Sequence, residues 1–168
     1  MTFRGEVVAI HVATEAGAPM TELDVVEAIA GRGLAGDRYA DASGTFSEKL
    51  SAGRQVTLIE SEALDAIAAE QGIELAPGES RRNLTTRGVP LNHLVGREFT
   101  VGGVRMRGVG LCEPCGHLQR KLEIDQLVQT LAHRAGLKAE IVDGGAIRTG
   151  DAIEPAPGHQ RADPGDPR

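Results

Sequence analysis

The stretch Phe99-Thr100-Val101-Gly102-Gly103-Val104-Arg105-Met106 decides the fold class. Two apolar, β-favouring runs flank a pair of glycines, which can adopt the positive φ angles of a tight two-residue turn. This pattern is typical of a β-hairpin. The whole chain has 22 glycines in 168 residues, a share that favours tight turns between many short strands. We therefore expect a mostly β structure.

Downstream of this hairpin the pattern recurs. Ala139–Val142 and Ala146–Arg148 flank a second pair, Gly144-Gly145, which predicts a second hairpin. Asp151–Glu154 is expected to form the last strand. The chain after Pro155 is rich in Pro, Gly, Asp and Arg and has little apolar surface to bury, which predicts disorder. The sequence thus predicts one domain over residues 1–155 and a disordered tail over residues 156–168.

Upstream of the hairpin, short apolar runs alternate with loops. The helical spacing of Ala63, Leu64, Ile67 and Ala68 predicts a helix that begins with Ser61 as N-cap and ends at Gly72. A second helix is expected after the hairpin, over Leu118–His133. The remaining predicted elements are strands at Glu6–Val12, Leu23–Ile29, Gln55–Ile59 and Asn83–Thr86, and a long polar loop over Gly36–Gly53. Together these elements predict an α+β chain, mostly β with inserted helices, arranged as a β-barrel.

Charge and hydropathy exclude two classes of function. A formal net charge of −6 argues against a general nucleic-acid binder, because no broad basic face dominates. No apolar run approaches the roughly 20 residues of a membrane span. The N-terminus also lacks the apolar core of a signal peptide, so we expect no membrane association and a cytoplasmic location.

The densest group of reactive side chains is Cys112-Glu113-Pro114-Cys115-Gly116-His117. Two cysteines three residues apart do not make a disulfide framework, and in a reducing compartment such a pair is catalytic, redox-active or metal-binding. Because Cys115 precedes a predicted helix, the N–H groups and dipole of that helix would favour its thiolate. A thiolate attacks sulfur, carries a persulfide or binds a soft metal.

Arg81-Arg82-Asn83 precedes a predicted strand. If these residues are extended, Arg81 and Asn83 share one side and Arg82 takes the other. An arginine fork beside an amide suits a phosphate or a pterin edge. The alternative is a solvated surface pair between Arg81 and Glu79.

Two weaker candidates remain. Asp37-Arg38 follows Gly36 at the mouth of the long loop, where an ordinary turn with an exposed ion pair is the alternative interpretation. His133-Arg134 ends the second predicted helix, where cations stabilise the last turn.

These segments, in their order, resemble the MOSC family, named for the C-terminal domain of molybdenum cofactor sulfurases. The similarity extends over about residues 5–154. The matching stretches are Gly33–Tyr39, Arg54–Ile59, Arg81–Leu84, Leu94–Arg97, Cys112–Cys115, His133–Leu137 and Gly144–Asp151.

The resemblance implies a closed or partly open β-barrel with Greek-key character and a bound molybdenum cofactor (molybdopterin). It implies that Cys115 is the functional thiol, which carries a persulfide or ligates molybdenum. The CxxC pair itself suits sulfur transfer, because Cys112 can resolve a persulfide as a disulfide. It also implies a cofactor contact by Arg81 and Asn83. Asp37, Arg38, His133 and Arg134 lie in matching stretches and complete the candidate cofactor-binding set.

The length limits the activity that the resemblance implies. Full sulfurases carry an additional pyridoxal phosphate domain, for which 168 residues leave no room. The expected partners are therefore a pterin cofactor or a sulfur donor or acceptor protein. One alternative is a molybdenum-dependent reductase of N-hydroxylated compounds. A non-catalytic alternative is a structural zinc site formed by Cys112, Cys115, His117 and His133.

The cysteine pair yields a first prediction. With a limiting alkylating reagent at about pH 6.5, Cys115 should be labelled before Cys112, because a lowered pKa leaves more of it as thiolate. Peptide mass analysis reads the site of labelling. Cys115→Ser should abolish sulfur loading or molybdenum binding, whereas Cys112→Ser should retain part of it. Equal, slow labelling of both thiols contradicts the prediction and favours the zinc alternative.

Overall fold

The computed structural model describes residues 1–15, 17–40, 55–112 and 132–158. It confirms the mostly β fold. The second expected helix, Leu118–His133, lies almost entirely outside the described residues, and Ala132 and His133 at its end form a turn. The strands are β1 (Gly5–Val12), β2 (Thr21–Leu23), β3 (Val25–Ile29), β4 (Gly33–Leu34), β5 (Val56–Glu60), β6 (Leu84–Arg87), β7 (Glu98–Val101), β8 (Val104–Leu111), β9 (Leu137–Asp143), β10 (Gly145–Arg148) and β11 (Ala152–Pro155).

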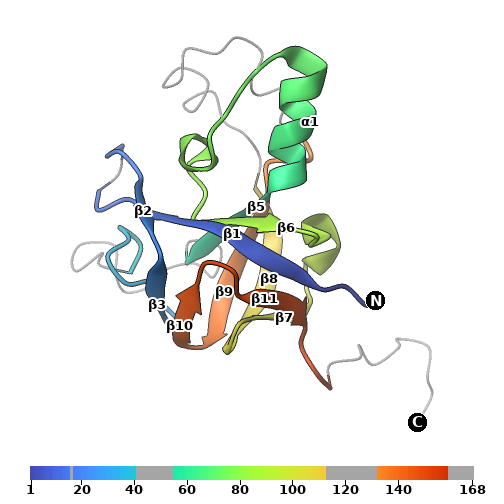
Figure 1. Ribbon diagram of the computed structural model, residues 1–168. Helices are drawn as coiled ribbons and strands as arrows, with labels where there is room; N and C mark the ends of the chain where they lie inside the picture. Colours follow the sequence, from blue (N-terminus) through green and yellow to red (C-terminus); the bar gives the residue numbers. More distant parts are fainter. Residues whose placement is uncertain (16, 41–54, 113–131, 159–168) are drawn as a thin grey trace.

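Seven strands form a closed, mixed β-barrel (Figure 1). Around the barrel the order is β1, β11, β7, β8, β9, β5 and β6, and β6 pairs with β1 again. Neighbouring strands are antiparallel except β5 and β6, which run parallel. Strand β1 completes the closure because its first residues pair with β11, whereas its last residues pair with β2.

The hairpin predicted from Gly102-Gly103 is confirmed as β7 and β8, with Val101 opposite Val104. Alternate residues of the two strands point into the barrel, where Phe99 and Met106 are fully buried. Their neighbours Thr100 and Arg105 point outward and are only partly covered. The period of two in the sequence therefore reports the two faces of the barrel wall.

The prediction of a second hairpin at Gly144-Gly145 is wrong. Strands β9 and β10 do not pair, and β10 instead joins a separate three-stranded sheet in the order β10-β3-β4. A Cβ atom on Gly144 would lie 2.5 Å from the carbonyl oxygen of Ala28. This glycine therefore permits close approach to β3 as the chain leaves the barrel wall, rather than a tight turn between two neighbours.

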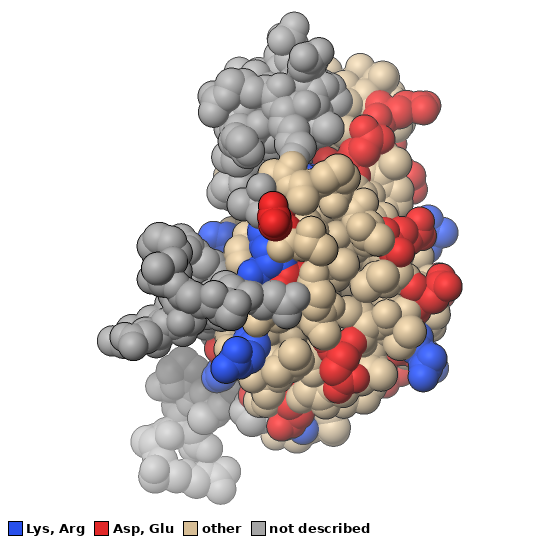
Figure 2. Space-filling model, turned by 90° about the vertical axis from the view of Figure 1, so that its left-hand side faces the viewer, with Lys and Arg blue, Asp and Glu red and all other residues tan. Residues whose placement is uncertain are grey.

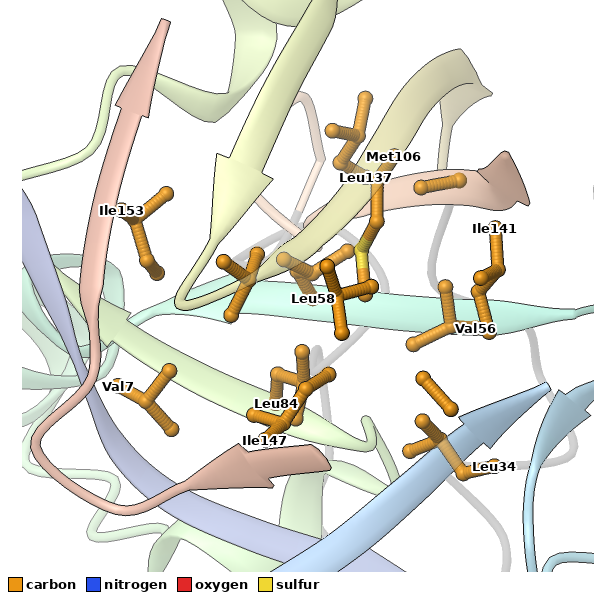
Figure 3. Close-up of a cluster of buried hydrophobic side chains, with 14 of the residues drawn as sticks. Val7, Leu34, Val56, Leu58, Leu84, Met106, Leu137, Ile141, Ile147 and Ile153 are labelled. Atoms are coloured by element: carbon orange, nitrogen blue, oxygen red, sulfur yellow. The ribbon is translucent and has the colours of Figure 1, made fainter. Parts of the chain in front are cut away.

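The hydrophobic core fills the barrel and continues under the small sheet. Figure 3 shows Leu58 and Leu84 from the barrel wall near Ile147 of β10, with Leu34 of β4 close to Val56. All five side chains are fully buried in one cluster. The small sheet therefore shares the barrel core instead of forming a second domain.

The connection between β5 and β6 contains α1 (Ser61–Gln71) and the 3₁₀ helix η3 (Pro77–Ser80). A parallel pair needs such a crossover, because a tight turn can only join antiparallel strands. Gly72 ends α1 in the left-handed conformation, as predicted, but Glu60 rather than Ser61 occupies the N-cap. No helix within the described residues has the length and apolar character needed to cross a membrane.

Two connections remain. The 3₁₀ helix η4 (Leu91–Leu94) precedes β7 and packs against the barrel wall. Within the described residues, packing continues to residue 156, because Ala156 is buried and its N–H donates to the carbonyl of Glu98. The rest of the expected tail, from residue 159, lies outside the described residues.

Two glycines on β8 provide a matched stability test. A Cβ on Gly108 would lie 2.1 Å from the carbonyl oxygen of Leu94, whereas no atom of the described residues lies within 4 Å of one on Gly110. Gly108→Ala should therefore lower the free energy of unfolding by about 2–3 kcal/mol, because η4 must move off the strand. Gly110→Ala should change it by less than about 0.5 kcal/mol. Urea denaturation measures both, and equal losses would contradict this packing.

Candidate functional site

A small cavity lies where the beginnings of β5 and β6 meet the turn after β4. Its volume is about 40 Å³. Since a single buried water needs a cavity volume of roughly 10–15 Å³, this cavity has room for a larger group such as a phosphate. Its lining residues are Met20, Asp37, Arg38, Tyr39, Thr57, Arg81, Arg82 and Asn83.

The parallel pairing of β5 and β6 brings Thr57 against Asn83. Leu58 pairs with Leu84, so the preceding residues of both strands meet at the same end of the barrel. The Asn83 backbone N–H donates to the Thr57 carbonyl at 3.1 Å. In return, the Thr57 N–H and hydroxyl both donate to Asn83 Oδ1, at 3.0 and 3.2 Å.

The side chain of Asn83 is the centre of the site's hydrogen bonding. It is 3% exposed. Its Nδ2 donates to the carbonyl of His11 at 3.1 Å and to Asp37 Oδ1 at 3.3 Å. Since Oδ1 already accepts two bonds from Thr57, both donors and both acceptor positions of the amide are matched inside the protein. Asn83 therefore holds its neighbours in place, and the cofactor contact expected for it stays a prediction.

Asp37 is a buried carboxylate beneath the cavity. Its Oδ1 accepts a hydrogen bond from the backbone N–H of Ala13 at 3.0 Å, in addition to the bond from Asn83. Burial raises its pKa, and the hydrogen bonds from Ala13 and Tyr39 together with the charge of Arg38 partly oppose this shift. The exposed ion pair considered from the sequence is therefore replaced by a buried, hydrogen-bonded anchor.

Arg81 presents its guanidinium to the cavity from an unusual backbone position. It follows η3 with φ of 61°, in the left-handed region. Its Nη1 donates to the carbonyl of Ala18 at 2.8 Å. Its Nη2 is buried and has no hydrogen-bond partner among the described residues. Glu79, the alternative partner considered from the sequence, instead accepts a hydrogen bond from the N–H of Ala76.

The expected separation of Arg82 from Arg81 and Asn83 is wrong. Because Arg81 has a left-handed backbone, residues 81–83 do not form an extended strand, and all three line one cavity. Arg82 Nε also donates to the carbonyl of Ala135 at 2.9 Å. This bond connects the cavity to the segment that enters β9.

Positive charge concentrates at this cavity. The Arg38 guanidinium donates to the Tyr39 hydroxyl at 2.9 Å and lies 4.7 Å from the centre of the ring. Burial lowers the pKa of Arg81, and the charge of Arg38 lowers it further. Figure 2 views the side of the molecule that carries β2 and η3, where Lys and Arg side chains appear at several separate places among acidic ones. Crowded, partly desolvated guanidinium groups with an unmatched donor favour an anionic ligand.

The cysteine pair is only partly described. Cys112 is buried with Ile59, Leu64 and Ile67 under α1, and its N–H donates to the carbonyl of Gly136 at 2.8 Å. Cys115, like His117, lies outside the described residues. The role expected for this thiol therefore stays a prediction.

His133 and Arg134 are not among the residues that line this cavity, which we call the arginine cavity after Arg38, Arg81 and Arg82. The carbonyl of His133 accepts a hydrogen bond from Asn92 Nδ2 at 2.7 Å. Arg134 forms an ion pair with Glu70 of α1, at 2.7 Å between Nη2 and Oε2. Both contacts fasten the chain before β9 to the body of the protein.

Sequence reasoning missed two neighbours of the site. Thr57 looked like an ordinary strand residue, because only the pairing of β5 with β6 reveals its contact with Asn83. His11 is buried against η3, where a Cβ on Gly78 would lie 2.8 Å from its ring. Burial lowers the pKa of His11, against the opposing charge of Glu22. A histidine within a predicted strand carries no signal of such a contact.

Comparisons with known proteins place the chain among others of the same fold. A family model described as MOSC domain matches residues 42–154. The YuaD protein of Bacillus subtilis superposes with a TM-score of 0.74 at 20% identity, over 92% of this chain and 96% of that one. YiiM of Geobacillus stearothermophilus superposes with a TM-score of 0.69 at 15% identity, over 90% of this chain and 75% of that one. YiiM of Escherichia coli superposes with a TM-score of 0.66 at 18% identity, over 93% of this chain and 70% of that one. No curated protein matches the sequence.

The position of Asn83 yields a stability prediction. Asn83→Ala should lower the free energy of unfolding by about 2–4 kcal/mol, because it removes the hydrogen bonds that buried groups of Asp37, Thr57 and His11 make with the amide. Asn92→Ala is the matched control. It removes one exposed hydrogen bond and should cost less than about 1 kcal/mol. Chemical denaturation compares the two variants, and similar losses would show that Asn83 does not organise the site.

Proposed function

Because the chain belongs to the MOSC domain family, we propose that it binds the molybdenum cofactor and holds the cofactor's phosphate in the arginine cavity. The observation that carries this proposal is Arg81 Nη2, a buried donor with no partner among the described residues. An unmatched buried donor is costly, and a ligand oxygen that accepts its hydrogen bond would remove the cost.

The chemistry of the lining fits a phosphate. Arg38, Arg81 and Arg82 supply three cations, against the single carboxylate of Asp37. A guanidinium group binds phosphate oxygens through parallel N–H bonds, which an ammonium group cannot do. The volume of about 40 Å³ admits a phosphate but not a pterin. The pterin therefore needs further contacts beyond this cavity.

Cys115 is proposed as the working thiol of the same site. Two bonds connect the arginine cavity to the start of the cysteine segment: Arg82 donates to Ala135, and Cys112 donates to the adjacent Gly136. The segment that contains Cys115 therefore begins close to residues fixed by the cavity. As a thiolate, Cys115 would carry a persulfide or ligate molybdenum. The bound cofactor would supply a metal centre that accepts sulfur or exchanges oxygen.

Metal and sulfur analysis of protein purified without a histidine tag separates the proposal from its alternatives. Stoichiometric molybdenum, or labile sulfur lost in Cys115→Ser, supports it. Stoichiometric zinc favours the structural zinc site. Within the described ranges no group of three His, Cys, Asp or Glu side chains is placed to hold a metal ion. Zinc, if bound, would therefore require residues of the cysteine segment.

The arginine cavity yields a binding prediction. Arg81→Ala should weaken cofactor retention by about 1.5–3 kcal/mol, because it removes a charge-assisted hydrogen bond. This loss corresponds to roughly 10- to 150-fold weaker binding. Molybdenum per chain after purification from cofactor-producing cells measures the effect. Arg4→Ala is the control, because Arg4 is 77% exposed and pairs only with Glu154 among the described residues. Full retention by Arg81→Ala, with a lowered melting temperature, would make Arg81 structural.

A further inference from the structure

The arginine cavity contains an acidic group that a simple anion site does not need. Asp37 is 2% exposed, and it lines the cavity together with three arginines. A buried carboxylate beside a bound anion weakens the attraction of that anion to the arginines. Its presence therefore calls for a role in the choice of ligand, beyond its role as an anchor for Ala13 and Asn83.

The two oxygens of Asp37 have different surroundings. Oδ1 accepts hydrogen bonds from Ala13 N–H at 3.0 Å and from Asn83 Nδ2 at 3.3 Å, which fills its two acceptor positions. Oδ2 has one long contact, with the Tyr39 N–H at 3.5 Å. At that distance a hydrogen bond is weak. Oδ2 therefore keeps acceptor capacity on a residue that lines the cavity.

We propose that Asp37 makes the cavity select tetrahedral oxyanions that carry a hydrogen, by accepting a hydrogen bond from the hydroxyl of the bound anion. This inference rests on the proposed function of the cavity as an anion site. The favoured class contains monohydrogen phosphate and the singly protonated form of a phosphomonoester. Sulfate carries no hydrogen at neutral pH and belongs to the disfavoured class.

The arginines alone cannot make this distinction. Monohydrogen phosphate and sulfate have the same charge and nearly the same size, so Arg38, Arg81 and Arg82 attract both about equally. With sulfate, a bare oxygen would face Asp37 Oδ2, and two acceptors without a hydrogen between them repel. With phosphate, the hydroxyl donates to the carboxylate.

Calorimetric titration of the full chain with three inorganic anions tests the selection. At about pH 7.5 and constant ionic strength, phosphate should bind at least about tenfold more tightly than sulfate, since one buried hydrogen bond is gained and one repulsion is avoided. Monofluorophosphate, in which fluorine replaces the hydroxyl, should bind as weakly as sulfate. Equal binding of all three anions overturns the selection and leaves the anion site standing.

The same titration of the Asp37→Asn variant provides a second test of the selection. An amide at position 37 can donate to any oxyanion, so sulfate should gain affinity and the preference for phosphate should fall to within about twofold. Asp65→Asn, an exposed change on α1, should keep the wild-type preference. An unchanged preference in folded Asp37→Asn overturns the inference. If Asp37→Asn fails to fold, the comparison of phosphate with monofluorophosphate in the wild type decides. If none of the anions binds the wild type, the anion site and the selection fall together.

Discussion

The parallel pairing of β5 and β6 is the constraint on which the site depends. A parallel pair cannot be joined by a tight turn. The chain must therefore leave the barrel at the end of β5, pass through α1 and η3, and re-enter at the end of the barrel where β5 begins. This route places Thr57 and Asn83 side by side and delivers Arg81 and Arg82 to the rim just before re-entry. An antiparallel connection at this point would place the two strand beginnings at opposite ends of the barrel. Thr57 and Asn83 would then lie too far apart to form the hydrogen bonds that support the site.

The cavity combines a neutral, fully matched hydrogen-bond network with a charged, incompletely matched one. Asn83 satisfies every donor and acceptor of its amide within the protein, which makes it a rigid support. Among the residues that the structure describes, the Arg81 guanidinium makes one hydrogen bond, to a backbone carbonyl, and keeps one buried donor unmatched. Rigid support beneath an unsatisfied group is the arrangement expected of a preorganised binding site, because the ligand need not order the protein as it binds.

The sequence predicted local elements well and distant contacts poorly. The β7–β8 hairpin and α1 depend on residues a few positions apart, so their periodicity and glycines were sufficient. The closure of β1 on β11 and the parallel alignment of β5 with β6 join residues far apart in the chain, which no local pattern encodes. Gly144-Gly145 was misinterpreted because glycine serves both tight turns and close backbone approach, and only the three-dimensional structure distinguishes them.

Within the site, too, local sequence is informative and contacts between distant residues are not predictable from it. Arg81 and Asn83 are candidates from residue type and from resemblance to the MOSC family, but the sequence does not distinguish their surroundings. The role of Asn83 depends on its alignment with Thr57 and on the approach of Asp37 from 46 positions away. The buried position of His11 depends on a turn whose path the sequence does not reveal. Residue chemistry indicated which side chains were candidates, whereas the fold determines which of them are fully hydrogen-bonded and which, like Arg81, keep a buried donor unmatched among the described residues.

The left-handed backbone of Arg81 has a consequence for the evolution of this chain. Position 81 has a φ of 61°, a conformation that glycine adopts without steric cost and that other residues adopt at a cost of about 1 kcal/mol. Burying an unmatched guanidinium adds to that cost. Selection for stability alone would therefore favour glycine at this position. Under the proposed function, the arginine at position 81 lowers the stability of the empty protein in exchange for the capacity to bind an anion.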